Sequence, residues 1–256
     1  MKLIKLFVRI LPVLFMFISF AACGMSSVNE TQQDLYANID LSQYSEYGSL
    51  SDDGIMWVKK SGYDDVQYGY INSNGEYVVP LSNEITLPHD FQNGFAVAEF
   101  GDQWQGTLCK IYNTSGEVVA QFFRTGLTIM EHLNNGNIYL KGVSVDDAFA
   151  AEENKAYMFC AESKKMVGMP YTTDYIDYSD GLMLVCSDYM EKTIKYFDSD
   201  GNCVLDLVTN SEYSVYIATD FVNGKANIAF VGKDGKNYTV DIDKTGKWLT
   251  EPVAVN

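Results

Sequence analysis

The sequence predicts an all-β fold made of five repeats of about forty residues each. The chain of 256 residues contains 18 Tyr and 14 Phe but only 5 Pro, and aromatic side chains suit the half-buried surface of a pleated sheet. Glycine-containing turns recur at Gly54, Gly94, Gly136, Gly181 and Gly224, at intervals of 40, 42, 45 and 43 residues. A near-constant interval in this range is typical of a repeat architecture in which each interval is one supersecondary unit.

Residues 1–22 are predicted to be a secretory signal. Lys2, Lys5 and Arg9 precede an apolar run at 10–20. This run is too short to span a bilayer as a mature helix. We therefore expect the rest of the chain to be exported.

The signal ends in Ala21-Ala22-Cys23, which resembles a bacterial lipobox, although Phe20 stands where that pattern usually has Leu. The resemblance implies that the Cys23 thiol is acylated and becomes the new N-terminus. Each buried methylene of an acyl chain contributes about 0.8 kcal/mol, so two or three chains would hold the protein to a membrane. Ordinary secretory cleavage with an unmodified Cys23 is the alternative. Residues 23–45 are expected to form a flexible tether, and 46–256 the repeat domain.

The net charge of the chain is −16. Because 1–22 contain three basic residues and no acid, the remainder carries −19. A surface this acidic repels phosphate backbones and anionic lipid, so we expect no nucleic-acid partner.

The residues behind each opening glycine predict the first strand of each unit. The positions two and four after the glycine are apolar in every unit: Met56 and Val58, Ala96 and Ala98, Ile138 and Leu140, Met183 and Val185, Ala226 and Ile228. Positions two apart in a strand face the same side, so these ten residues are expected to line one buried face. The residue between them varies (Trp57, Val97, Tyr139, Leu184, Asn227), and Asn227 indicates that the second face need not be dry in every unit.

A second turn follows in four of the units, at Asn72–Gly75, Asn113–Gly116, Asp198–Gly201 and Asp243–Gly246. Asn or Asp at the first place can accept a hydrogen bond from the backbone two residues on, and Gly at the fourth takes positive φ without steric cost. Together they predict a tight hairpin with a type I turn and a glycine bulge. Nine glycines are thus predicted to be structural turn residues: Gly54, Gly75, Gly94, Gly116, Gly136, Gly181, Gly201, Gly224 and Gly246.

The third unit is irregular. It contains an insertion whose residues 146–154 could form one or two helical turns, and its hairpin near Ser163–Lys165 lacks the glycine. Insertions in repeat proteins often lie on the binding face. Divergence without function is the alternative.

These features resemble the WG-repeat family of bacterial proteins, also called KWG repeats. The best match is the first unit, with DGIMWVKK at Asp53–Lys60, YGYIN at Tyr68–Asn72 and NGEYVVP at Asn74–Pro80. Tyr68 stands where the name-giving Trp would be, and the Trp-Gly pair is absent from the other units. The resemblance covers about Ser45 to Asn256 and implies a β-propeller or propeller-like array. It brings no catalytic residues. From the residues alone, a stacked β-solenoid also fits.

Four cysteines remain after Cys23, and an exported chain can oxidise them. Cys186 and Cys203 flank one hairpin and are the first candidates for a disulfide. Buried thiols that behave as small apolar residues are the alternative. The four cysteines lack C-x-x-C spacing, so we expect no metal site and no cofactor.

Other candidates for chemistry are few. His89 and His132 are the only histidines, and neither has neighbouring residues at ligand spacing. Asp198–Gly201 and the acids Asp174, Asp177 and Asp180 faintly resemble calcium loops but lack the closing Glu, so hairpin chemistry explains them better.

The sequence therefore favours a non-enzymatic, lipid-anchored surface protein whose repeat domain binds a protein or glycan of the cell envelope. One alternative is a glycan hydrolase with two carboxylates in a propeller channel. A third interpretation is a structural protein of the envelope, present in high copy number and without a specific ligand. Two or three acids that converge in one pocket with aromatic walls would favour the enzyme.

Overall fold

The computed structural model describes residues 36–63, 65–101, 107–145, 156–172, 176–187, 193–207 and 213–255, without the side chains of 125–128 and 187. The predicted secretory signal, Cys23 and the insertion at 146–154 lie outside the described residues.

Five units of four antiparallel strands follow one another along the chain. The first comprises β1 (Glu46–Tyr47), β2 (Ile55–Ser61), β3 (Val66–Asn72) and β4 (Tyr77–Ser82). The second comprises β5 (Ile85–Pro88), β6 (Phe95–Phe100), β7 (Thr107–Asn113) and the first part of β8 (Val118–His132). The third comprises the rest of β8, β9 (Ile138–Ser144), β10 (Ala156–Cys160) and β11 (Lys165–Met169). The fourth comprises β12 (Tyr178–Ser179), β13 (Leu182–Ser187), β14 (Thr193–Phe197) and β15 (Cys203–Asp206). The fifth comprises β16 (Ser214–Ala218), β17 (Ala226–Val231), β18 (Asn237–Ile242) and β19 (Val253–Val255).

Strand β8 belongs to two units. Its first part pairs with β7 and its last part with β9, and the register shifts between Arg124 and Ile129. The second and third units therefore form one seven-stranded sheet, while the other three sheets have four strands each.

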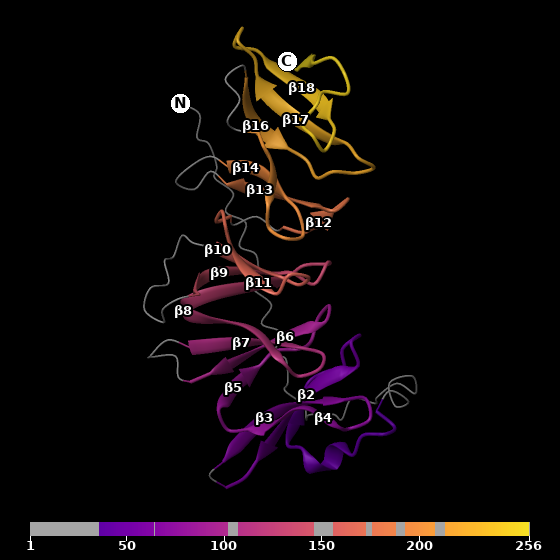
Figure 1. Ribbon diagram of the computed structural model, residues 1–256, viewed down its shortest axis with the longest axis vertical. Helices are drawn as coiled ribbons and strands as arrows, with labels where there is room; N and C mark the ends of the chain where they lie inside the picture. Colours follow the sequence, from indigo (N-terminus) through magenta and orange to yellow (C-terminus); the bar gives the residue numbers. More distant parts are fainter. Residues whose placement is uncertain are drawn as a thin grey trace, which may run out of the picture.

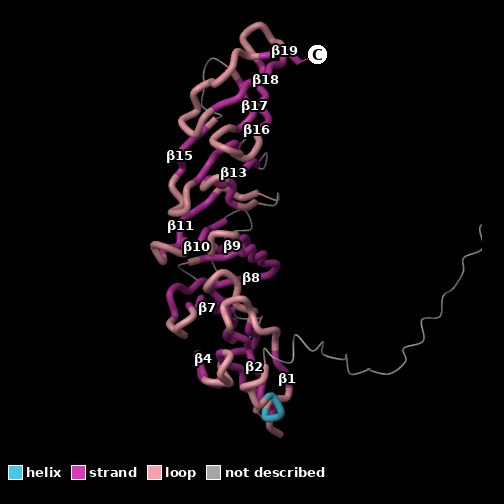
Figure 2. The backbone as a smooth tube through the Cα atoms, turned by 90° about the vertical axis from the view of Figure 1, so that its right-hand side faces the viewer, coloured by secondary structure: helices cyan, strands magenta, loops and turns pink. Residues whose placement is uncertain are grey.

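The sheets succeed one another along the long axis of the molecule, with the first and last units at opposite ends (Figures 1 and 2). The prediction of an all-β, propeller-like repeat array is confirmed, and the array is open because its sheets do not close into a ring. Among the described residues the only helix is the short 3-10 turn η1 (Leu41–Gln43).

The hairpin turns have the predicted chemistry. In each of the four units the first side chain of the turn accepts hydrogen bonds from the backbone two and four residues on. Asn72 Oδ1, for example, accepts from the amides of Asn74 at 2.9 Å and Glu76 at 3.0 Å, and Asn113, Asp198 and Asp243 do the same. All nine turn glycines have positive φ, from 73° at Gly54 to 90° at Gly94. In the third unit Lys164 takes φ 56° in place of glycine.

The core lies between the sheets. The ten apolar residues behind the opening glycines are at most 3% exposed, and from the second unit on each pair packs against the preceding unit. Ile138 and Leu140, for example, share a cluster with Val97 of the second unit. The residue between the members of each pair therefore faces the next unit. In the last unit the residue between the pair is Asn227. No later unit in the described part of the chain covers this side of the last unit.

The segment before β1 closes the other end of the array. Ile39 and Tyr44 are 8% exposed and pack against Met56 and Val58. The predicted flexible tether over 23–45 is therefore wrong for residues 36–45, because their apolar side chains cover a sheet face that water would otherwise reach.

Candidate functional site

The opening turns of adjacent units are joined by side-chain hydrogen bonds. Asp53 Oδ2 accepts a bond from the Gly94 amide at 2.9 Å, and Asn93 Nδ2 donates to the Leu133 carbonyl at 2.9 Å. Farther along, the Asp180 carboxylate accepts a bond from the Gly224 amide, which lowers the pKa of Asp180. These bonds hold the turns of successive units in one row.

Buried tyrosines tie the same units together. Tyr70 and Tyr196 hold equivalent places before the hairpin turns, and both are fully buried. The Tyr70 hydroxyl donates to the His89 carbonyl of the next unit at 2.9 Å, and that of Tyr196 donates to the Thr219 carbonyl at 2.6 Å. Burial raises the pKa of both hydroxyls, so they remain donors.

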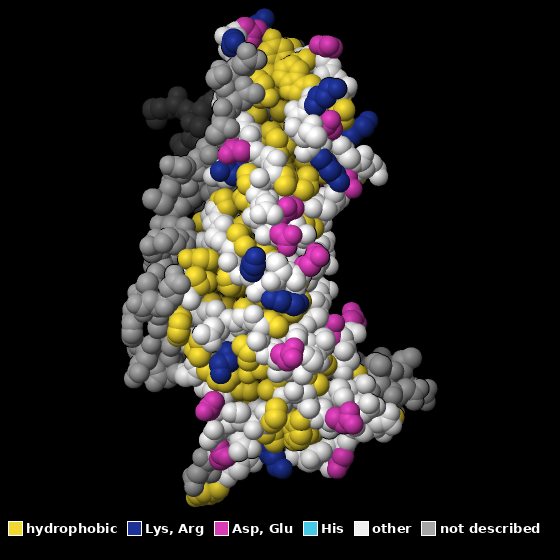
Figure 3. Space-filling view, in the orientation of Figure 1, with side chains coloured by type: hydrophobic (Ala, Val, Ile, Leu, Met, Phe, Trp, Pro, Cys, Tyr) yellow, Lys and Arg dark blue, Asp and Glu magenta, His cyan; other side chains and the backbone are white. Residues whose placement is uncertain are grey.

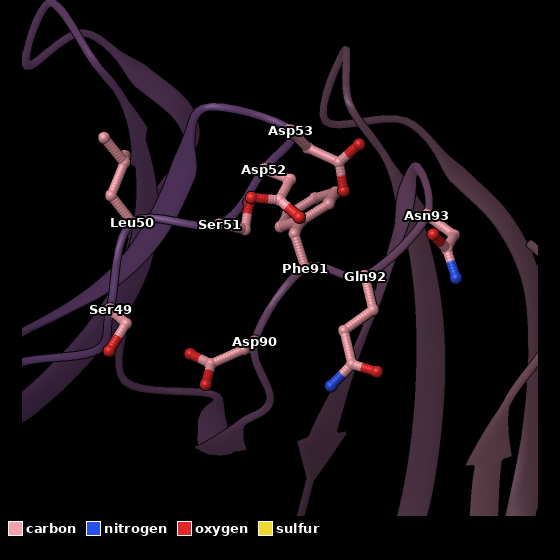
Figure 4. A pocket seen from close by; sticks show the side chains of 9 residues that line it. All are labelled: Ser49, Leu50, Ser51, Asp52, Asp53, Asp90, Phe91, Gln92 and Asn93. Atoms are coloured by element: carbon pink, nitrogen blue, oxygen red, sulfur yellow. The ribbon is translucent and has the colours of Figure 1, made fainter. Parts of the chain in front are cut away.

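A cavity of about 460 Å³ opens between the turns of the first and second units. Its lining combines three carboxylates, two amides and two hydroxyls with two apolar side chains. The lining residues are Ser49, Leu50, Ser51, Asp52, Asp53, Asp90, Phe91, Gln92 and Asn93. The two segments face each other across the cavity (Figure 4). We call this the turn pocket.

Its side chains differ in their freedom to meet a ligand. Asp53 is held by its bond to Gly94. Phe91 is 2% exposed and packs edge-on against Tyr70 at 5.3 Å between ring centroids, so it offers no open ring face. Asp52 and Asp90 are the remaining carboxylates. The pocket is anionic and rich in hydrogen-bonding groups, which suits cationic or hydroxyl-rich ligands.

A second cluster of charges lies in the second unit. The Glu99 side chain is 5% exposed and contacts His89 Nε2 at 3.1 Å and the Arg124 guanidinium at 2.6 Å. Cys109 pairs with Glu99 across β6 and β7. Burial, reinforced by the Glu99 charge, raises the pKa of the Cys109 thiol to about 12. A thiol held protonated at neutral pH is a poor nucleophile.

His132, the other histidine, is half-buried and interacts electrostatically with His89. Burial, followed by the charge of His89, lowers its pKa.

The predicted disulfide between Cys186 and Cys203 is wrong. All four described cysteines are in the thiol form. Cys186 pairs with Ile194 and Cys203 with Phe197, on opposite sides of β14. The Cα atoms of the two cysteines are two strand spacings apart across the sheet and three residues apart along it, which places them more than about 10 Å from each other. Bridged Cα atoms lie within roughly 7 Å.

The turns that resemble calcium loops are structural where the structure describes them. Both Asp198 oxygens accept bonds within its own hairpin turn, and Asp177 accepts from the amides of Asn134 and Tyr178. Asp174 lies outside the described residues. Within the described ranges, no group of three His, Cys, Asp or Glu side chains is placed to hold a metal ion.

Sequence reasoning missed the turn pocket and the bonds between turns. A signal for the bonds exists, because Asp or Asn directly precedes the opening glycine in every unit, at Asp53, Asn93, Asn135, Asp180 and Asn223. The charged cluster around Glu99 had no signal, since its members lie far apart in the sequence.

None of the helices in the described segments has the length and apolar character needed to cross a bilayer.

Comparison with solved structures gives distant similarities. The β-propeller domain of the Trilobed protease from Pyrococcus furiosus is 12% identical with a TM-score of 0.35, over 84% of this chain and 70% of that one. A protein of unknown function from Bacteroides caccae is 13% identical with a TM-score of 0.27, over 79% and 78%. The WD40 domain of Toxoplasma gondii coronin is 10% identical with a TM-score of 0.30, over 80% and 57%. TM-scores this low carry no argument about function. Among curated proteins the chain has no match.

The WG containing repeat matches residues 68–104, which begin at Tyr68-Gly69 in β3. A Cβ on Gly69 would lie 2.7 Å from the Val79 carbonyl oxygen, so the close approach of β4 explains the glycine of this motif. The match and the strand arrangement together support a WG-repeat protein.

Proposed function

We propose that this chain is an exported, lipid-anchored surface protein whose repeat array is a non-enzymatic binding platform for a protein or glycan of the cell envelope. The observation that carries the binding role is the turn pocket, because it combines ligand-binding groups with a rigid frame. Its walls are fixed to each other by the bond between Asp53 and Gly94 and to the core by Phe91. Pre-organised side chains lose less conformational entropy when a ligand binds.

The anchor is supported by the sequence alone, through Cys23 and the apolar run before it. The test is incorporation of labelled palmitate by cells that produce the full chain. Cys23→Ser should abolish labelling and release the protein from the membrane fraction. Cys203→Ser is the matched control because Cys203 is exposed, and it should leave both unchanged. Equal labelling of the Cys23→Ser variant would contradict the anchor.

The binding role is tested by capture from a cell-envelope extract with the membrane-anchored full chain as bait. Asp52→Asn with Asp90→Asn removes two charges from the turn pocket. Asp200→Asn with Glu251→Gln removes two charges from exposed positions outside it. We expect at least a tenfold loss of the captured protein or glycan with the pocket pair and no change with the control pair. Equal capture by both pairs would remove the turn pocket from the proposal.

The second candidate is a glycan hydrolase, favoured by one observation, the three carboxylates that line a single pocket. General acid and base catalysis on a glycosidic bond uses two carboxyl groups. The aromatic wall expected of such a site is missing among the described lining residues, since Phe91 is buried. Release of reducing ends from envelope glycans, lost in both Asp52→Asn and Asp90→Asn, would establish the enzyme and overturn the non-enzymatic proposal.

A further inference from the structure

The last sheet has one face without a cover from the described residues. Val215 and Phe230 pair with each other and pack toward the fourth unit. Because neighbouring residues in a strand face opposite sides, Ala229 and Val231 point away from the array. We call this outward side of β16–β19 the terminal face.

Strand register defines what the terminal face presents. One row across the sheet reads Ile217, Ala229, Thr239 and Val253, and the next reads Ser214, Val231, Asn237 and Val255. Ile217 is 55% exposed, Val253 64% and Val255 46%. Hydrophobic side chains gather over this end of the molecule (Figure 3).

Every earlier unit in the described chain has this face covered by the unit that follows it. Val97 and Tyr139, which lie on it in the second and third units, are fully buried against the following unit. The outward side of a unit is therefore shaped to pack against the face of another β-repeat unit.

The charge of the last unit differs from that of the others. Residues 213–255 contain five acidic and five basic side chains, whereas 46–207 contain 25 acidic and 10 basic ones. Two molecules that meet through their last units place neutral ends together and keep the acidic bodies apart. Contact between two of the earlier units brings acidic surfaces close, which opposes association.

We propose that the terminal face is a self-association surface, on which a second copy of this chain packs tail to tail about a twofold axis. Head-to-tail packing is blocked because Ile39 and Tyr44 already cover the opposite end of the array. An interface between identical patches of two copies forms a closed dimer. Each membrane-anchored dimer would then carry two turn pockets.

The test is the mass of the full chain in mild detergent, measured by density-matched sedimentation equilibrium with micelles in excess. We expect twice the mass of the processed, acylated chain at micromolar concentration. Ile217→Lys with Val253→Glu should weaken association at least tenfold. Val222→Glu is the control, since Val222 is 61% exposed but lies in the opening turn. A monomeric wild-type chain, or equal dissociation of the control, would overturn the proposal.

Cross-linking gives a second measurement that does not depend on a disruptive variant. In a Cys203→Ser background, Val253→Cys should form a dimer with a short bis-maleimide linker. Tyr47→Cys, exposed at the other end of the array, should give none. Tail-to-tail pairing would be overturned if only the Tyr47→Cys variant formed a cross-linked dimer. It would also be overturned if the Val253→Cys variant cross-linked only to a different protein.

Discussion

Replacing Gly116 with alanine tests how tightly the first two units are packed. Gly116 and Gly75 hold the same place in the hairpin turns of neighbouring units, and both have a φ of 80°. A Cβ on Gly116 would lie 2.0 Å from the carbonyl oxygen of Val78 in the preceding unit, whereas a Cβ on Gly75 would have its nearest neighbour at 3.7 Å. The two positions therefore share the backbone strain and differ in the clash.

The magnitudes follow from these two effects. An alanine in the left-handed conformation costs about 1–2 kcal/mol at either position. Overpacking typically adds about 1–3 kcal/mol, and here the clash is with main chain, so one unit must shift away from the other. We expect Gly116→Ala to lower the free energy of unfolding by about 2–5 kcal/mol and Gly75→Ala by about 1–2 kcal/mol.

Urea unfolding followed by far-ultraviolet circular dichroism measures both losses. Tryptophan fluorescence adds a local signal, because Trp57 packs in the cluster between the first two units. Gly116→Ala should alter that signal before global unfolding, and Gly75→Ala should not. Equal losses of stability in the two variants would refute the close contact between the Gly116 turn and Val78.

Three further measurements test the packing of the array. Gly69→Ala should lower the free energy of unfolding by about 1–3 kcal/mol. Gly168→Ala, where a Cβ meets nothing within 4 Å, should be neutral or slightly stabilising. Thermal unfolding compares the two variants, and equal midpoints would refute the clash at Gly69. Tyr196→Phe should cost about 1 kcal/mol through the lost bond to the last unit, measured by urea unfolding, and no loss would show that this bond adds no net stability. Burial raises the pKa of the Cys109 thiol from 9.0 to about 12 and that of Cys160 to about 11. The folded state thus holds these protons more tightly, so stability should be level below about pH 8 and fall as pH rises from 9 toward 11. Urea titrations of a Cys109→Ala, Cys160→Ala variant should show a shallower fall, and an unchanged fall would exclude these thiols as its cause.

The five-unit frame could be predicted from the sequence because it depends on local chemistry. Turn residues such as Asn72 and Gly75 act within four residues of the chain, and the alternation of Met56 and Val58 sets which side of a strand is buried. The prediction was weakest in the third unit, where Lys164 adopts positive φ without the glycine that signals such a turn.

The candidate site could not be predicted because it depends on contacts between units. Asp53 lies next to Gly94 only after two sheets have stacked, and the turn pocket forms between those two turns. The Cys186–Cys203 pairing failed for the same reason. Closeness in sequence suggested a bridge, but strand register places β14 between the two thiols.

By itself, the sequence determined that this protein is a β-repeat with turns at fixed places, since each turn is encoded by the residues that form it. Only the tertiary structure decided that the array stays open, which turn glycines touch a neighbouring unit, and that the described residues leave Ile217, Val253 and Val255 exposed on the terminal face. The physical reason is that the units between the two ends bury both of their faces against neighbouring units. What a face meets is therefore set by the unit beside it, and the last sheet has no such neighbour within the described chain.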